Sequence, residues 1–387
     1  MIERDMLPTL LQASREYPVV TLTGPRQSGK TTLCRMAFPD KPYINLEAPD
    51  IRQFAIDDPR GFLDTIPDGA ILDEIQRTPD IPSYLQEMVD QDPVAGRFIL
   101  TGSQQFELMD QVSQSLAGRT ALLRLLPLSI QELKKAGKLP SLFSLMHSGF
   151  YPRIIQNRLN PSQALGEYFS TYVERDLRQL SAIHDMQKFE RFVRLCAGRT
   201  GQLLNLNNLG SDAGVTQSTA RQWLDLLQAS YIIFLLPPWF TNTRKRLVKT
   251  PKLYFYDVGL AAWLLGIHQT EQIQRDPLYG ALFENMMIID RLKTKYNQRA
   301  AADCYFYRDN IGHEVDLLEP VGSQVHAIEI KAGATINSDY FKGLAQFKKS
   351  FSEQFLDGSV IYAGEQAQQR TYWQVLPWHA AETNTLS

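Results

Sequence analysis

The feature that most constrains the fold is a glycine-rich run at residues 24–32, which reads Gly-Pro-Arg-Gln-Ser-Gly-Lys-Thr-Thr. It follows a short apolar run, Val19–Thr23, and precedes a helical pattern. A glycine, four residues and then Gly-Lys-Thr is the spacing of a phosphate-binding loop, whose backbone N–H groups turn inward on the phosphates. The N-terminus of the following helix adds a positive potential. We therefore expect a nucleotide site at the end of this run.

The neighbouring segments indicate the fold class. Two further apolar runs, Ala70–Leu72 and Arg97–Thr101, alternate with helical patterns within residues 1–140. Strands that alternate with helices predict a parallel sheet with helices on its faces. The predicted class is therefore α/β, with a P-loop NTPase core.

Each residue of the glycine-rich loop is a candidate ligand of the nucleotide. Lys30 is expected to reach the β- and γ-phosphates, and the Thr31 hydroxyl is expected to ligate Mg²⁺. ATP and Mg²⁺ are therefore the predicted cofactors. The predicted contacts in the loop are Gly24, Pro25, Arg26, Gln27, Ser28, Gly29, Lys30, Thr31 and Thr32.

Two carboxylates, Asp73 and Glu74, end the apolar run Ala70–Leu72. In P-loop enzymes the first such carboxylate holds Mg²⁺, which is Asp73 here. Glu74 is placed to act as the general base that polarises the attacking water. An acidic pair at a strand end can also be solvated surface, but the loop upstream favours the catalytic interpretation.

Three further residues, Thr101, Ser103 and Arg119, each allow two interpretations. Thr101 or Ser103, at the end of the third apolar run, could sense the γ-phosphate or could mark a simple exit from the strand. Arg119 could act as a finger on the nucleotide of a neighbouring subunit, which would require a homo-oligomer, or could be a solvated surface residue.

Together these motifs resemble the bacterial and archaeal AAA-type ATPases that carry a C-terminal DUF4143 domain. The resemblance rests on residues 22–32, 72–76, 100–103, 116–119 and 127–129, and it continues through 172–176 into the last third of the chain. It implies nucleotide binding and hydrolysis. One departure is Ser103, because many AAA proteins have Asn or Thr at the sensor position.

A helix-turn-helix is predicted in the middle of the chain. The segment Leu203–Ala213 has a helical pattern, Gly214 provides a turn, and Thr216 can cap a second helix that extends to about Ala229. The outer face of this second helix carries side chains that hydrogen-bond base edges or phosphates. These are Gln217, Ser218, Arg221 and Gln222.

A basic hairpin follows, bounded by the predicted strands Tyr231–Leu236 and Leu253–Tyr256. Residues 237–252 contain no acidic residue and carry the charges Arg244, Lys245, Arg246, Lys249 and Lys252. In a chain with a net charge of −2, such a local cluster is typical of a phosphate-binding wing. DNA is therefore a predicted partner, although winged helices also serve as protein-docking modules.

A nuclease-like pattern occupies the last part of the chain. Glu329 and Lys331 are two residues apart on an apolar strand and therefore share a face, and Asp316 precedes them. Carboxylates that bind Mg²⁺ and a lysine that positions water form the pattern of PD-(D/E)xK nucleases, whose fold DUF4143 domains resemble. Glu284, on a predicted helix at residues 281–296, could complete the acid set. Glu-Ile-Lys on a strand also arises as an ordinary ion pair, so cleavage stays open.

The predicted organisation has four parts: an AAA-type core (1–140), a helical lid (141–200), a winged helix-turn-helix (201–275) and a restriction-endonuclease-like α/β domain (276–387). The scattered cysteines argue against a zinc site or a disulfide framework, and no signal or membrane segment is expected, which favours the cytoplasm.

The predicted function is an ATPase that couples ATP hydrolysis to DNA binding or remodelling, as in recombination, repair, or the processing of mobile or defence DNA. One alternative is an ATP-gated switch that acts on protein partners through an inactive nuclease-like docking domain. The other alternative is an ATP-regulated, metal-dependent nuclease.

Overall fold

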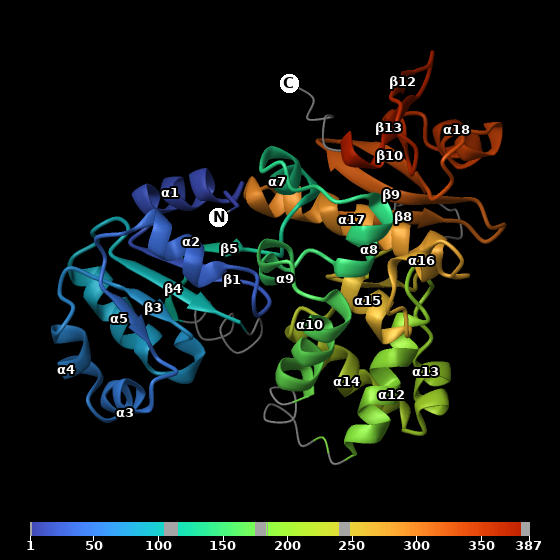
Figure 1. Ribbon diagram of the computed structural model, residues 1–387. Helices are drawn as coiled ribbons and strands as arrows, with labels where there is room; N and C mark the ends of the chain where they lie inside the picture. The colour runs from blue at the N-terminus through green and yellow to red at the C-terminus, as the bar shows by residue number, and fades with distance from the viewer. Residues whose placement is uncertain (1, 104–114, 175–182, 184, 240–247, 381–387) are drawn as a thin grey trace.

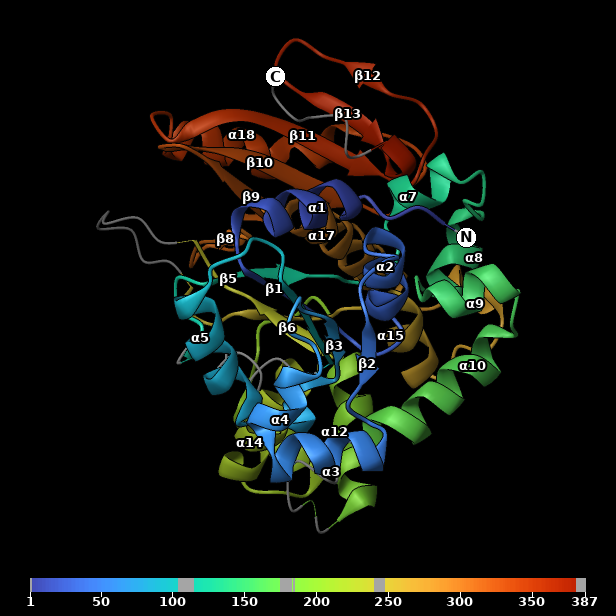
Figure 2. The ribbon, with the colours of Figure 1, turned by 90° about the vertical axis from the view of Figure 1, so that its left-hand side faces the viewer.

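The computed structural model describes residues 2–103, 115–174, 183, 185–239 and 248–380 (Figures 1 and 2). Its first sheet has five parallel strands in the order β2-β3-β4-β1-β5. The bounds are β1 (Val19–Thr23), β2 (Tyr43–Asn45), β3 (Ile71–Asp73), β4 (Phe98–Gly102) and β5 (Thr120–Arg124). The parallel α/β core predicted from the sequence is confirmed, while β2 and β5 were not predicted.

Helices cover both faces of this sheet because alternate residues of its strands point to opposite sides. The side chains of Val20 and Leu22 pack with one helical layer, and those of Val19, Leu72 and Leu100 pack with the other. The first layer is α1 (Leu7–Glu16) and α2 (Lys30–Ala37), and the second is α3 (Pro49–Asp57), α4 (Pro59–Asp64) and α5 (Ile81–Gln91), with a 3-10 turn at Ile75–Arg77.

A group of mainly short helices follows the core. Its elements are α7 (Ile130–Lys135), α8 (Leu142–Ser148), α9 (Pro152–Asn157), α10 (Pro161–Tyr168), α12 (Met186–Ala197), α15 (Val258–Leu264) and α16 (Thr270–Ile273). The Asn160 side chain caps α10 by accepting from the Gln163 N–H, and the helix therefore begins at Pro161. A π-helix at Phe169–Glu174 follows it directly.

The helix-turn-helix consists of α13 (Leu206–Ala213) and α14 (Gln217–Ala229). The backbone of Gly214 adopts the left-handed conformation that ends α13. The Thr216 hydroxyl caps α14 by accepting a hydrogen bond from the Thr219 N–H. The antiparallel strands β6 (Ile233–Leu236) and β7 (Lys252–Phe255) flank the wing. The wing tip, including the candidates Arg244, Lys245 and Arg246, lies outside the described residues.

The C-terminal region contains a mixed sheet in the order β12-β13-β11-β10-β9-β8. Its helix α17 packs on one face and α18 on the other. The bounds are α17 (Tyr279–Asn297), β8 (Tyr305–Arg308), β9 (Glu314–Val321), β10 (Gln324–Lys331), α18 (Lys342–Ser350), β11 (Phe355–Tyr362), β12 (Gln368–Gln369) and β13 (Gln374–Pro377), with 3-10 turns at Ser338–Phe341 and Trp378–Ala380.

Helix α17 lies between the two sheets and belongs to a core shared by several regions (Figures 1 and 2). Buried side chains of the short helices, of α13, α14, β6 and β7, and of the C-terminal sheet form one continuous hydrophobic cluster with it. The boundaries of the four predicted domains stay predictions. Among the described residues, no helix is both long and apolar enough to cross a bilayer.

Candidate functional site

The glycine-rich loop lies where β1 ends and α2 begins. Gly24 has a φ of 147°, and a side chain there would place its Cβ 2.1 Å from the carbonyl oxygen of Leu125 on the neighbouring segment. Only glycine fits such an approach. The Lys30 ammonium is buried inside the loop and donates to the carbonyl oxygens of Gly24 (2.8 Å) and Pro25 (2.9 Å). Burial lowers the pKa of Lys30, while the nearby carboxylates of Glu74 and Asp73 oppose that shift.

Asp73 lies beside the loop and gathers three hydroxyl groups. Its Oδ2 accepts from the Thr31 hydroxyl at 2.9 Å and from the Tyr43 hydroxyl at 2.6 Å, and its Oδ1 accepts from Thr101. Thr31 and Asp73 thus form a pair of hard oxygen donors of the kind that Mg²⁺ prefers. Tyr43 was missed from the sequence because it stands on β2, a short strand without a motif.

Glu74 directly follows β3 and adopts a left-handed conformation with a φ of 59°. Such a backbone is uncommon for a bulky residue and often occurs at functional sites. The Glu74 Oε2 accepts from the Ser103 hydroxyl at 3.0 Å and from the Gln76 amide. Ser103 therefore holds Glu74, and Thr101 holds Asp73. The sensing roles predicted for Thr101 and Ser103 stay predictions.

Arg119 lies at the opposite edge of the sheet from the loop. Its carbonyl oxygen accepts from the N–H of Val19, where β1 begins, whereas the loop follows the end of β1. Its guanidinium forms an ion pair with Asp90, with one Nη2–Oδ2 distance of 2.8 Å. Arg119 therefore does not reach the nucleotide site of its own chain, and its role as a finger on a neighbour stays a prediction.

A tyrosine connects β1, the strand before the loop, to the segment that follows α14. Tyr231, just after α14, is buried with a φ of 56°, and its hydroxyl lies 2.9 Å from the hydroxyl of Thr23, the last residue of β1. Arg124, at the end of β5, lies over the ring of Tyr296 on α17 and donates to its hydroxyl. The core sheet thus contacts the segment after α14 through Thr23 and contacts α17 through Arg124.

The exposed face of α14 carries the side chains predicted to contact DNA. Gln217, Ser218, Arg221 and Gln222 are exposed, while Ala220, Leu224 and Leu227 are buried as expected. Lys249 is also exposed. The fold does not bury these candidates, and their contact with DNA stays a prediction.

Lys252 departs from the prediction that all five positive charges of the basic hairpin are available to phosphate. Its side chain is only 3% exposed, and its ammonium pairs with Glu284 Oε1 at 3.0 Å and with Glu314. Burial alone would lower its pKa, but the carboxylates of Glu284, Asp316 and Glu314 raise it above the usual value for lysine. Lys252 is therefore a buried, neutralised cation that joins β7 to the C-terminal region.

Replacing Lys252 by alanine is expected to lower the free energy of unfolding by about 3 kcal/mol, because two buried or half-buried carboxylates would lose their partner. The matched change Lys249→Ala removes an exposed lysine three residues away and should cost less than about 0.5 kcal/mol. Urea unfolding of both variants measures the difference. Equal effects would contradict the buried ion pair.

The nuclease-like residues are only partly brought together. Lys331 donates to Asp316 Oδ2 at 3.1 Å and to Glu329 Oε2 at 2.6 Å. Glu284 instead accepts from Lys252 and Tyr254. Within the described ranges, no group of three His, Cys, Asp or Glu side chains could hold a metal ion. The second metal site predicted from Glu284, Asp316 and Glu329 is therefore not formed as a three-carboxylate set.

Burial and neighbouring charges shift the pKa values of Glu329 and Asp316 in opposite directions. Burial and the charge of Asp316 raise the pKa of Glu329 well above its usual range. Burial also works to raise the pKa of Asp316, but the ammonium groups of Lys331 and Lys252 hold it below its usual value. A Cβ on Gly343 would lie 1.9 Å from Glu329 Oε1, so the first turn of α18 packs directly on this carboxylate. Both carboxylates are buried, an arrangement that suits a structural polar cluster.

Comparisons with known proteins agree with this architecture. Three family models match the chain: an AAA domain, AAA_14, at residues 16–134, and two domains of unknown function, DUF8612 at 139–271 and DUF4143 at 279–381. An uncharacterized protein of Mycobacterium tuberculosis is 32% identical over 335 residues, which is 86% of this chain and 74% of that protein.

More distant proteins match over similar lengths. An uncharacterized protein of Haemophilus influenzae is 22% identical over 334 residues, covering 77% of this chain and 80% of that protein. The solved Walker-type ATPase of Pyrococcus abyssi is similar with a TM-score of 0.45 and 16% identity, covering 68% of this chain and 96% of that one.

Proposed function

We propose that this chain, which belongs to the AAA-type ATPases with a C-terminal DUF4143 domain, binds and hydrolyses ATP and couples the nucleotide state to DNA binding. The observation that carries the proposal is the convergence of Lys30, Thr31, Asp73 and Glu74 at one edge of the sheet. The glycine-rich run contributes Lys30 and Thr31, whereas Asp73 and Glu74 come from a separate segment. The glycine-rich run by itself therefore does not bring the four residues together.

The chemistry follows from the positions of these groups. The loop N–H groups and the Lys30 ammonium would bind the phosphates, and Glu74 would orient and deprotonate a water for attack on the γ-phosphate. Thr31 and Asp73 fit Mg²⁺, which would neutralise charge that develops on the phosphates. Ser103 and Gln76 would keep the Glu74 carboxylate in place between turnovers. As part of the proposal, Arg119 would act on a neighbouring subunit's nucleotide in a homo-oligomer.

The link from ATP to DNA is the contact between Tyr231 and Thr23. Thr23 directly precedes the phosphate-binding loop, and Tyr231 lies two residues after the end of α14, whose exposed face carries Arg221. A change in the loop on nucleotide binding would therefore change the position of α14 relative to the core sheet. Because coupling is reciprocal, DNA bound to α14 would change the affinity for the nucleotide by the same factor.

Removing the Tyr231 hydroxyl is expected to weaken this coupling. A buried hydrogen bond contributes about 0.5–1.5 kcal/mol, so Tyr231→Phe should change the ratio of DNA affinities with and without a non-hydrolysable ATP analogue by about two- to thirteenfold. Fluorescence anisotropy of a labelled duplex at several salt concentrations measures both affinity and its salt slope. Tyr372→Phe, at an exposed surface position, is the control.

DNA binding and its coupling to the nucleotide are tested by different outcomes. Wild-type protein that shows no salt-dependent affinity for duplex or branched DNA would contradict DNA binding and favour the switch that acts on protein partners. Wild-type protein that binds DNA, with Tyr231→Phe showing an unchanged affinity ratio, would contradict only the coupling route. The nuclease alternative has less support, because Glu284 is engaged elsewhere and α18 covers Glu329.

A further inference from the structure

Arg4, in the segment before α1, lies directly against the phosphate-binding loop. Its Nη1 donates to the carbonyl oxygen of Ser28 at 2.6 Å, and its Nη2 donates to the carbonyl oxygen of Leu126 at 2.6 Å. Its Nε donates to Glu132 Oε1 at 2.9 Å. Each nitrogen of the guanidinium thus has an acceptor, and the side chain is 8% exposed. Three of the five N–H donors of Arg4 are therefore engaged by the protein.

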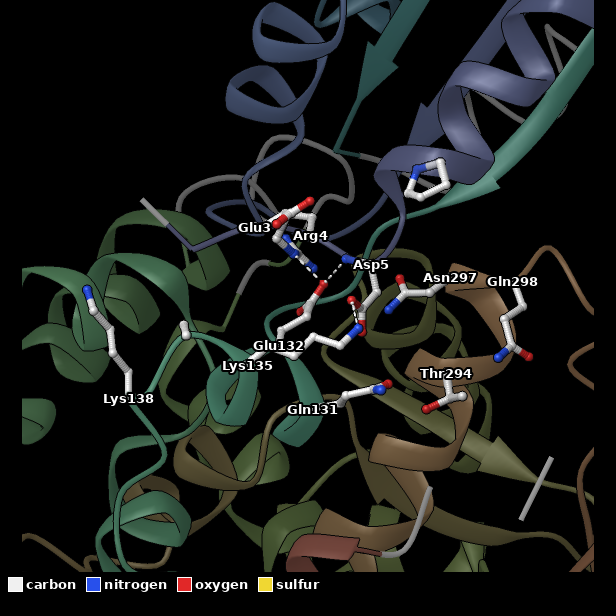
Figure 3. A pocket seen from close by; sticks show the side chains of 12 residues that line it. Glu3, Arg4, Asp5, Gln131, Glu132, Lys135, Lys138, Thr294, Asn297 and Gln298 are labelled. Atoms are coloured by element: carbon white, nitrogen blue, oxygen red, sulfur yellow. Dashed lines mark hydrogen bonds and ion pairs between the residues drawn. The ribbon is translucent and has the colours of Figure 1, made fainter. Parts of the chain in front are cut away.

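Glu132 holds the guanidinium in one orientation. Besides Arg4, its carboxylate accepts from the N–H of Asp5 at 2.8 Å and from the N–H of Ser129, the cap of α7, at 2.8 Å. Figure 3 shows Arg4 and Glu132 facing each other, next to the ion pair between Asp5 and Lys135. These residues line a hollow of about 660 Å³ between the N-terminal segment, α7 and the end of α17. A side chain tied at so many points loses little further entropy when it orders the loop.

The carbonyl group that Arg4 holds belongs to the peptide between Ser28 and Gly29. In a planar trans peptide, the C=O and the following N–H point in opposite directions. Fixing the Ser28 oxygen on Arg4, outside the loop, therefore turns the Gly29 N–H toward the inside. Gly29 is the cap of α2, where unpaired N–H groups and the helix dipole favour a phosphate.

We infer that Arg4 is a positioning residue for ATP: it orients the Ser28–Gly29 peptide so that the Gly29 N–H is aimed at the phosphates before the nucleotide arrives. The inference rests on the proposed ATP binding and extends it to a residue outside the glycine-rich run. A preorganised donor stabilises bound phosphate more than one that must first reorient. Loss of Arg4 should therefore act on ATP affinity more than on the chemical step.

The test is Arg4→Lys, because lysine keeps the charge but has a single ammonium that cannot bridge three acceptors in a fixed fork. We expect the Kd for a fluorescent ATP analogue and the KM for ATP to rise about tenfold or more, and kcat to change less than about threefold. The control is Arg291→Lys, which alters a similarly buried ion pair with Glu319, far from the loop. It should lower Tm to a similar extent and leave both constants within about twofold.

A second variant keeps the inference testable if Arg4→Lys does not fold. Glu132→Gln preserves shape but removes the charge that holds the guanidinium, and the Kd for ATP should rise about threefold. Unchanged ATP affinity in the folded variants, or an equal loss in Arg291→Lys, would overturn the positioning role. Wild-type protein that binds no ATP would overturn the proposed function as well, which separates the two failures.

Discussion

Replacing Glu74 by glutamine is expected to lower kcat for ATP hydrolysis about 100- to 10,000-fold, the usual contribution of a general base. Glutamine can still accept hydrogen bonds from Ser103 and Gln76 through its carbonyl oxygen, so the site should keep its shape. The variant should therefore bind ATP with nearly wild-type affinity and retain it unhydrolysed. Single-turnover hydrolysis of labelled ATP, together with equilibrium binding, measures the two effects separately.

The control for this experiment is Glu47→Gln. Glu47 lies near the loop and forms loose ion pairs with Arg26 at 3.7 Å and with Arg77 at 4.0 Å, with its side chain 43% exposed. The Glu47→Gln variant should hydrolyse ATP within about threefold of the wild-type rate, because exposed ion pairs contribute little to stability. Undiminished hydrolysis in Glu74→Gln would exclude Glu74 as the base.

Replacing Lys30 by alanine is expected to lower kcat/KM for ATP about 100- to 1,000-fold, which corresponds to about 3–4 kcal/mol of transition-state stabilisation. The Lys30 ammonium is buried at the centre of the loop, where water does not screen it and its attraction for phosphate is strong. Alanine also frees the carbonyl oxygens of Gly24 and Pro25, so the loop should lose part of its shape. Both binding and turnover should suffer, in contrast to Glu74→Gln.

Lys41→Ala is the matched control for Lys30. Lys41 follows α2 and donates to the carbonyl oxygen of Arg97, at the edge of the sheet away from the loop. Steady-state hydrolysis over a range of ATP concentrations should show near wild-type constants for this variant. A Lys30→Ala enzyme that turns over ATP at the wild-type rate would refute the assignment of the nucleotide site.

Much of the nucleotide site could be predicted because its signals are local. The loop, its flanking strand and the Asp73–Glu74 pair each occupy a few consecutive residues, and the parallel sheet brings their strand ends to one edge. The same holds for the helix-turn-helix, where Gly214 and Thr216 mark the turn and the cap. A backbone preference acts over a few residues and is therefore visible in the chain itself.

The errors arose where a residue's surroundings come from distant segments. A lysine in a basic stretch suggests exposure, yet Lys252 is buried because Glu284 and Glu314 approach it from α17 and β9. The same contact gives Glu284 hydrogen-bond partners, Lys252 and Tyr254, outside the group in which the nuclease-like pattern had placed it. Spacing within a strand predicts which side chains share a face but not which neighbours pack against that face.

The amino-acid pattern alone is enough to predict a glycine-rich loop on a parallel α/β core, because glycine, lysine and apolar runs act through short-range backbone geometry. The contacts that support that loop depend on how distant segments pack. Arg4 meets Glu132 across 128 residues, and Tyr231 meets Thr23 across 208. Such contacts exist only after the chain has closed long loops and buried polar groups beside one another, and no local pattern records which partners will satisfy them.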